Sequence, residues 1–288
     1  MFSGAYTAIV TPFNRKGEVD YQKLRELIER QIKGGIDGIV PVGTTGESPT
    51  LDYDEHRKVI EVSVETCKKR IKVIAGTGAN STREAVDLTR FAAEIGADAT
   101  LQVAPYYNKP NQEGLARHFL AVAEIGLPVI LYNIPGRTGV EIAVDTIARL
   151  AKHPKITTIK EAGGSVPRVS QILDKCAIRV LSGDDPLTIP MMSVGAKGVI
   201  SVAANIVPEA VVRMVHFALD GNWQKAMAMH RKYFPLFAGV FLDTNPIPVK
   251  AALAMLGLIE EEYRLPLCPM SKVLKDKLAA CLRDLKLM

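Results

Sequence analysis

Eight short runs of β-forming residues alternate with amphipathic helical stretches along this chain of 288 residues. The runs predict strands at residues 5–10, 37–42, 72–76, 98–104, 128–133, 156–160, 178–183 and 197–203. Their apolar residues are nearly continuous, which is typical of parallel strands buried on both faces. The intervals between the runs are too long for hairpins and suit crossover helices. About eight such units over roughly 220 residues predict an α/β fold, the (β/α)8 TIM barrel.

An open, doubly wound sheet is the alternative arrangement of these units. It is disfavoured because no G-x-G-x-x-G turn follows the first run, and because about eight regular units suit closure into a barrel. The helical stretches between the runs carry clear end signals. The first ends at the glycines at 34 and 35, a common helix stop. Another is expected to start with Ser81 as N-cap and Glu84 completing a capping box, and to stop at Gly96.

After the eighth run the alternation ceases and helical segments follow. They are predicted near residues 208–219, 222–235, 246–257 and 270–285, with prolines such as Pro235 expected as punctuation. We interpret residues 1–225 as the barrel and residues 226–288 as additional C-terminal helices that pack on it. A separate second domain is not expected, because no linker-like composition divides the two parts.

Composition places the chain among globular proteins and excludes several functions. Hydrophobic residues make up 48% and charged residues 23%, and the net charge of +5 is spread along the chain. No basic block predicts binding to nucleic acid, and no apolar run is long enough to cross a membrane. The start of the chain lacks the features of a signal peptide, so a cytoplasmic location is expected. Neither the four scattered cysteines nor the five histidines have the spacing of a metal site.

Small and polar residues follow nearly every predicted strand. These segments are GTTGES at 43–48, GTGAN at 76–80, PYYNKP at 105–110, YNIPGRTG at 132–139, KEAGG at 160–164, SGDD at 182–185 and ISVAAN at 200–205. In a (β/α)8 barrel the carboxyl ends of the strands carry the chemistry. We therefore expect Tyr107, Tyr132, Arg137 and Lys160 to face one opening.

Several of these residues also have an ordinary structural interpretation. GTTGES is either a tight turn before the next helix or a set of backbone N–H groups and hydroxyls that bind an anion. Tyr132 suits strand packing and Arg137 suits the surface. Asp184 and Asp185 could bind a metal ion together, but helix N-capping after the seventh strand is the preferred interpretation.

Lys160 ends the run ITTIK and offers the most specific chemistry. A lysine at a strand end is commonly a solvated surface charge. Among apolar strand ends, however, burial penalises the ammonium form and favours the free amine. A free amine attacks a ketone to form a Schiff base, which then serves as an electron sink for carbanion chemistry. Gly163 and Gly164 are expected to leave room around that amine.

With GTTGES, PYYNKP, YNIPGRTG and IKEAGG in this order, the chain resembles the dihydrodipicolinate synthase family. The resemblance runs from AIVTPF at 8–13 to NPIPVKAAL at 245–253 and RLPL at 264–267. The wider superfamily includes N-acetylneuraminate lyase and 2-keto-3-deoxy sugar-acid aldolases, all pyruvate enzymes with a Schiff-base lysine. Thr44–Thr45 and Arg137 match the synthase branch. The arginine suits that branch, because the second substrate of the synthase, aspartate semialdehyde, has a carboxylate that a guanidinium can bind.

The resemblance implies a role for each matching residue. Lys160 would form the Schiff base with pyruvate, and Thr44, Tyr132 and Tyr107 would relay protons, with Tyr107 entering from a neighbouring subunit. Thr45 would hold the pyruvate carboxylate and Arg137 the semialdehyde carboxylate. The backbones of Gly183 and Ile200 would lie near the substrate and the imine. No metal or organic cofactor is implied, and the expected assembly is a homotetramer, a dimer of dimers.

Many members of the resembled family are inhibited by lysine at a cleft between subunits. The matching positions in this chain are Ser48, His56, Asn80, Glu84 and Tyr106. The chain departs from the pattern at Pro49 and Tyr53, so lysine is only a candidate effector.

Two alternatives stay open at this point. One is a pyruvate-dependent sugar-acid lyase or aldolase, and the other is a catalytically silent barrel that binds a ligand such as lysine.

Overall fold

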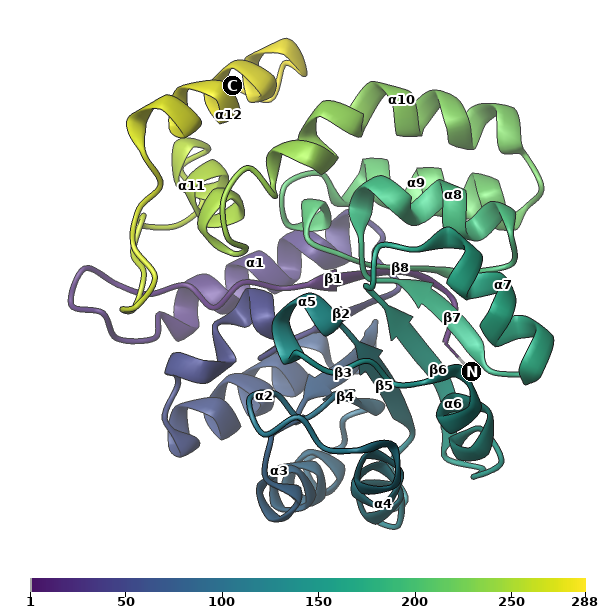
Figure 1. Ribbon diagram of the computed structural model, residues 1–288. Coiled ribbons are helices and arrows are strands. Elements are labelled where there is room, and N and C mark those ends of the chain that lie inside the picture. The colour runs from purple at the N-terminus through teal and green to yellow at the C-terminus, as the bar shows by residue number, and fades with distance from the viewer. Residues whose placement is uncertain (1) are drawn as a thin grey trace.

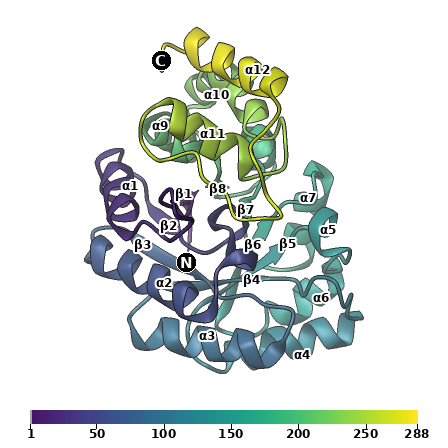
Figure 2. The same ribbon diagram turned by 90° about the vertical axis from the view of Figure 1, so that its left-hand side faces the viewer.

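The computed structural model describes residues 2–288 and shows a closed barrel of parallel strands surrounded by helices (Figure 1). Within these residues, eight strands are hydrogen-bonded in chain order, and the eighth closes on the first. They are β1 (Gly4–Ala8), β2 (Gly38–Val40), β3 (Lys72–Gly76), β4 (Ala99–Val103), β5 (Val129–Asn133), β6 (Ile156–Glu161), β7 (Arg179–Ser182) and β8 (Gly198–Ser201). Figure 2 shows the strands as a ring with helices outside it. The predicted (β/α)8 barrel is confirmed.

The helices that connect the strands cover the outside of the ring. They are α1 (Tyr21–Lys33), α2 (Tyr53–Cys67), α3 (Thr82–Glu94), α4 (Gln112–Ala123), α6 (Val144–Leu150), α7 (Val166–Lys175) and α8 (Thr188–Ser193). Short helical turns lie in the loops that follow the strands: η1 (Thr44–Gly46) and η2 (Ser48–Thr50) after β2, α5 (Pro135–Thr138) after β5, η3 (Asp185–Leu187) after β7, and η4 (Ala203–Asn205) after β8. These loops are therefore partly ordered by local hydrogen bonds.

The helix ends follow the predicted signals in part. Gly34 caps α1 as predicted, and the hydroxyl of Ser81 caps α3 by accepting a hydrogen bond from the N–H of Glu84 at 3.5 Å. The predicted capping box at Glu84 is wrong, because within residues 2–288 its carboxylate returns no bond to the backbone of Ser81. A complete box occurs instead at the start of α2, between Asp52 and Glu55.

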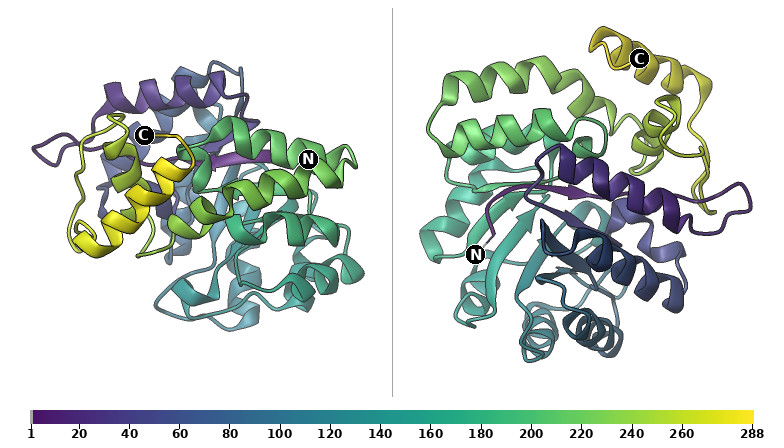
Figure 3. Two further views of the ribbon diagram at one scale, coloured as in Figure 1. Left: turned by 90° about the horizontal axis from the view of Figure 1, so that it is seen from above. Right: turned by 180° about the vertical axis from the view of Figure 1, so that it is seen from behind.

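Four helices follow β8 and gather on one side of the barrel (Figure 3). They are α9 (Pro208–Leu219), α10 (Trp223–Gly239), α11 (Ile247–Met255) and α12 (Lys272–Asp284). The expectation that Pro235 punctuates the second of them is wrong, because α10 continues through it. Pro235 is exposed, so water can reach the carbonyl that it leaves unpaired, while Leu236 and Phe237 beyond it are buried. Burial of these two side chains outweighs the lost backbone hydrogen bond.

The division of the chain at residue 225 stays a prediction. That position lies inside α10, which packs against both α9 and α12. The C-terminal segment also reaches the start of the chain, where Arg264 donates to the carbonyl of Gly17 at 2.9 Å and forms an ion pair with Glu55. Figure 1 shows this purple N-terminal loop beside the yellow segment.

Two buried apolar clusters hold the fold together. The larger lies between the barrel and its helices, and the smaller fills the barrel interior with residues such as Tyr6, Ile74, Tyr132 and Ile200. Because the interior is filled, only the ends of the strands can offer a binding site. Among the described helices, none is both long and apolar enough to cross a membrane.

Candidate active site

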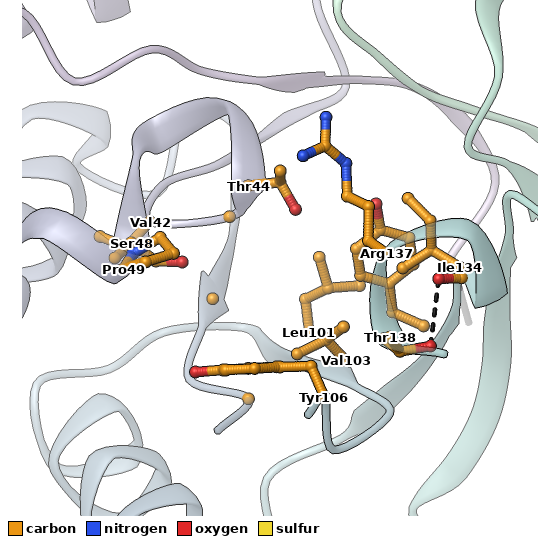
Figure 4. A pocket seen from close by; sticks show the side chains of 14 residues that line it. Val42, Thr44, Ser48, Pro49, Leu101, Val103, Tyr106, Ile134, Arg137 and Thr138 are labelled. Carbon is orange, nitrogen blue, oxygen red and sulfur yellow. Dashed lines mark hydrogen bonds between the residues drawn. The ribbon is translucent and has the colours of Figure 1, made fainter. Parts of the chain in front are cut away.

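A cavity of about 200 Å³ opens at the carboxyl ends of β2 to β5. It is lined by Val42, Gly43, Thr44, Ser48, Pro49, Gly76, Gly78, Leu101, Val103, Tyr106, Tyr132, Ile134, Arg137 and Thr138. In Figure 4 the side chains of Thr44 and Arg137 lie on the same side of the cavity, and the ring of Tyr106 lies across from them. Of the residues expected to face one opening, Tyr132 and Arg137 line this cavity, and Thr44 lines it with them.

Lys160 and Tyr132 lie directly opposite each other on neighbouring strands β6 and β5. Both are buried, with 5% and 4% of their surface exposed. The Nζ atom of Lys160 lies 4.2 Å from the centroid of the Tyr132 ring. Lys160 is therefore a buried lysine that contacts a tyrosine lining the cavity.

The room around the Lys160 side chain comes from Gly183, which directly follows β7. A Cβ atom at Gly183 would lie 2.8 Å from Cε of Lys160 and 2.7 Å from Cβ of Ala162. The expectation that Gly163 and Gly164 provide this room is wrong. Gly163 instead leaves space for the carboxylate of Glu161, to which its N–H donates at 2.8 Å, and a Cβ at Gly164 would meet open space.

The loop after β2 presents two threonines at the start of η1. Within residues 2–288 the backbone N–H groups of Thr44 and Thr45 form no backbone hydrogen bond, as is usual at the start of a helical turn. Thr44 lines the cavity, whereas Thr45 is buried behind it. The hydroxyl oxygen of Thr45 accepts a hydrogen bond from Nδ2 of Asn245 at 3.1 Å, so its own proton stays free to be donated.

Arg137 lies in the one-turn helix α5 and is exposed. Its guanidinium donates to the backbone carbonyl of Asn245 at 3.0 Å. Asn245, just before α11, therefore contacts both the loop after β2 and Arg137. The remaining guanidinium donors stay available to an anion in the cavity.

The two tyrosines after β4 point in different directions. Tyr106 is half-buried and lines the cavity, and burial together with the nearby Glu84 carboxylate raises its pKa. Tyr107 is 90% exposed, and its φ of 74° lies in the left-handed region. A bulky residue in that region is strained. Tyr107 does not reach the cavity of its own chain.

The residues predicted for a lysine site differ in their position relative to the cavity. Ser48 lines the cavity, and Asn80 donates to the carbonyl of Tyr106 at 3.3 Å. Glu84 is exposed in the first turn of α3. His56 is buried, its Nε2 lies 2.7 Å from the carbonyl oxygen of Gly76, and burial lowers its pKa. One ring nitrogen of His56 is therefore already occupied.

Asp184 and Asp185 do not cap the helix after β7, so the expected N-capping is wrong. Asp185 is fully buried and accepts hydrogen bonds from the hydroxyl of Ser201 and from the N–H groups of Val202 and Ala203. It therefore joins the loop after β7 to the end of β8. In the described part of the chain, no group of three or more His, Cys, Asp or Glu residues could hold a metal ion.

Comparisons with known proteins show the family of the chain. The model of the dihydrodipicolinate synthetase family matches residues 1–285. The chain belongs to this family. A 4-hydroxy-tetrahydrodipicolinate synthase of Geotalea daltonii is 54% identical over 290 residues and covers 100% of both chains.

Solved structures of dihydrodipicolinate synthases have the same fold. The chloride-inhibited enzyme of Acinetobacter baumannii, in complex with pyruvate, is 46% identical over 100% of both chains, with a TM-score of 0.98. The enzyme of Cyanidioschyzon merolae with lysine bound is 40% identical, covers 100% of this chain and 99% of its own, and has a TM-score of 0.96.

Sequence reasoning missed three residues that hold the loop after β2 in this member of the dihydrodipicolinate synthetase family. They are Asn245, described above, and the buried pair Glu47 and Lys250, whose charged atoms lie 2.5 Å apart. Their role depends on contacts across about 200 residues of sequence, which no local pattern records. One signal was present: Lys250 is a single charge in an apolar helix that is buried all round.

Proposed function

We propose that the protein is a lyase that condenses pyruvate with L-aspartate-4-semialdehyde to form 4-hydroxy-tetrahydrodipicolinate, through a Schiff base on Lys160. This reaction is the first committed step of diaminopimelate and lysine biosynthesis. The observation that carries the proposal is the buried Lys160 against Tyr132, at adjoining strand ends beside a cavity that also contains Thr44 and Arg137. Full-length relatives named for the same reaction support it.

The reaction begins when the free amine of Lys160 attacks the keto carbon of pyruvate. The C–N bond forms, the keto oxygen leaves as water, and the phenol of Tyr132 is placed to pass protons to and from the reacting atoms. Loss of a methyl proton from the imine then gives an enamine, because the C=N bond takes up the electron pair. The imine supplies the electron sink, so the chemistry requires no metal or organic cofactor.

The enamine carbon then attacks the aldehyde of the second substrate, and its carbonyl oxygen becomes a hydroxyl. The amino group of that substrate next attacks the imine carbon, the ring closes, and the amine of Lys160 leaves. Tyr132, Thr44 and Tyr107 form the proton relay in this proposal.

Two anion sites hold the substrates. Thr45 and its N–H group bind the pyruvate carboxylate, since the loop after β2 offers free N–H groups beside the cavity. Arg137 binds the carboxylate of the semialdehyde, because a guanidinium offers two parallel donors. The backbones of Gly183 and Ile200 lie near the substrate and the imine.

Tyr107 reaches the site of a neighbouring subunit in a homotetramer built as a dimer of dimers. The exposed, strained tyrosine supports this proposal, because strain persists where the conformation has a use. Free lysine is the proposed effector, bound between subunits near Ser48, Glu84 and Tyr106. Calorimetric titration with lysine should show saturable binding, and an absence of heat would contradict the effector proposal.

Borohydride reduction in the presence of pyruvate tests the main proposal. Reduction of the imine should add one pyruvate-derived group per chain, and peptide mass spectrometry should place it on Lys160. Lys160→Met is the control and should acquire no such group. Wild-type protein that gains no mass, or gains it on another lysine, would show that the Schiff-base mechanism is wrong.

A further inference from the structure

The backbone of the loop after β2 is strained on both sides of its two threonines. Val42 and Glu47 both have a φ of 55°, in the left-handed region that side chains other than glycine rarely adopt. For Val42 the strain is greatest, because its Cβ is branched. Thr44 and Thr45 lie between these two residues. Such a conformation persists only where neighbouring contacts impose it.

A buried ion pair holds the side chain of Glu47 from the distant helix α11. Nζ of Lys250 lies 2.5 Å from Oε1 of Glu47, and both side chains are 0% exposed. The ammonium also lies 4.2 Å from the ring centroid of Phe13 and 5.3 Å from that of Tyr263. These rings favour a cation at this place. Oε2 of Glu47 accepts a further hydrogen bond from the backbone of Arg264 at 3.4 Å.

Two hydrogen bonds between uncharged groups hold the residues that lie between Val42 and Glu47. The hydroxyl of Thr11 donates to the carbonyl of Gly46 at 2.7 Å, and Asn245 donates to Thr45 at 3.1 Å. The loop is therefore fixed along its length by residues near both ends of the chain. Glu47 is held by an ion pair, and beyond it the guanidinium of Arg264 donates to the carbonyl of Thr50 at 2.8 Å.

Stability alone does not explain a buried ion pair at this place. Removing two charges from water is costly, and well-packed apolar residues are often as stable or more so. Separating the two buried charges is, however, strongly destabilising, because each would be left without a partner. The pair therefore restricts where Glu47 can lie. That property suits a loop whose backbone N–H groups must point at a bound anion.

We propose that Lys250 and Glu47 are positioning residues that fix the loop after β2 so that Thr44 and Thr45 bind the carboxylate of the keto-acid substrate. This inference rests on the proposed function. Neither residue lines the cavity, and the pair acts through the loop. The helices that follow the barrel thus contribute to substrate affinity.

The test compares substrate dependence with folding in two variants. Lys250→Met leaves a buried, unpaired Glu47 and should be strongly destabilised. The double variant Lys250→Met with Glu47→Gln therefore removes both charges and keeps an acceptor for Arg264. Each is titrated with pyruvate in the borohydride reaction. The double variant should need about tenfold more pyruvate for half-maximal labelling, which corresponds to the loss of roughly one hydrogen bond to a charged group. Labelling at saturation should still reach one group per chain, on Lys160.

Lys275→Met is the matched control, because it breaks another ion pair after the barrel, with Glu261, that does not touch the loop. Its half-maximal pyruvate concentration should equal that of the wild type. The inference is overturned if the double variant needs the same pyruvate concentration for half-maximal labelling as the wild type, whatever its melting temperature. A pair with a purely structural role would change stability alone. Failure of the wild type to be labelled would instead overturn the proposed function.

Discussion

At the scale of single residues, the setting of Lys160 is made by neighbours that are distant in sequence. Strand register places Tyr132 beside it, and the missing side chain of Gly183 leaves space for its methylene groups. Sequence patterns indicated Lys160 itself, because burial among apolar strand ends would favour its free amine. They could not indicate which glycine lies against it, since that depends on how β6 and β7 align.

Gly183→Ala should reduce activity strongly while leaving the fold intact. The new Cβ would lie 2.8 Å from Cε of Lys160 and force that side chain to move. A displacement of about 1 Å in a reacting group costs roughly a hundredfold in rate. We expect a fall in kcat of that order by steady-state kinetics. Gly136→Ala is the control, because a Cβ there would meet no atom within 4 Å; equal activity of the two variants would contradict the prediction.

At the scale of elements, the ends of β7 and β8 are joined through one buried carboxylate. Asp185 accepts hydrogen bonds from Ser201, Val202 and Ala203, and burial raises its pKa to about 6. The sequence SGDD suggested helix capping because aspartate is common there. The actual partners lie on the next strand, so local pattern alone could not identify them.

Asp185 should make stability depend on pH in an unusual direction. Its folded pKa of about 6 exceeds the ordinary value of 3.8, so the folded state holds the proton more tightly. The resulting stabilisation is complete below about pH 4, decreases as pH rises, and is lost above about pH 6. The difference between the two pKa values corresponds to roughly 3 kcal/mol.

Chemical denaturation of the wild type and Asp185→Asn between about pH 4 and pH 7 checks this dependence. As pH rises, the free energy of unfolding of the wild type should fall relative to that of the variant, because only the wild type loses the contribution of Asp185. The other titrating groups are common to both proteins, so their contributions cancel in the difference. A difference that stays constant with pH would show that Asp185 does not titrate in this range.

At the scale of the whole molecule, the barrel followed from the sequence because its signal is repeated. Every predicted strand overlaps an observed one, and β3 agrees at both ends. The helices after the barrel were also predicted, with α9 agreeing at both ends, and the exception is the end of α10. α10 passes through Pro235, since burial of Leu236 and Phe237 depends on neighbours that the local pattern does not contain.

Mixed oligomers should reveal whether Tyr107 acts across subunits. Lys160→Ala and Tyr107→Phe are each expected to have low activity alone. Equal mixing with subunit exchange should restore roughly a quarter of wild-type activity, because half of the randomly formed dimers are mixed and each has one complete site. Activity that does not rise on mixing would place Tyr107 in the site of its own chain.

The contacts between the loop after β2 and residues 245–264 also concern the order in which the protein is made. The ribosome produces Thr45 and Glu47 about 200 residues before Asn245, Lys250 and Arg264. A nascent chain that already contains every strand and Lys160 would have the Thr11 contact to Gly46 but would still lack the contacts from residues 245–264. Catalytic competence should therefore arise late in translation, and a ribosome that stalls after β8 would release a barrel without a working enzyme.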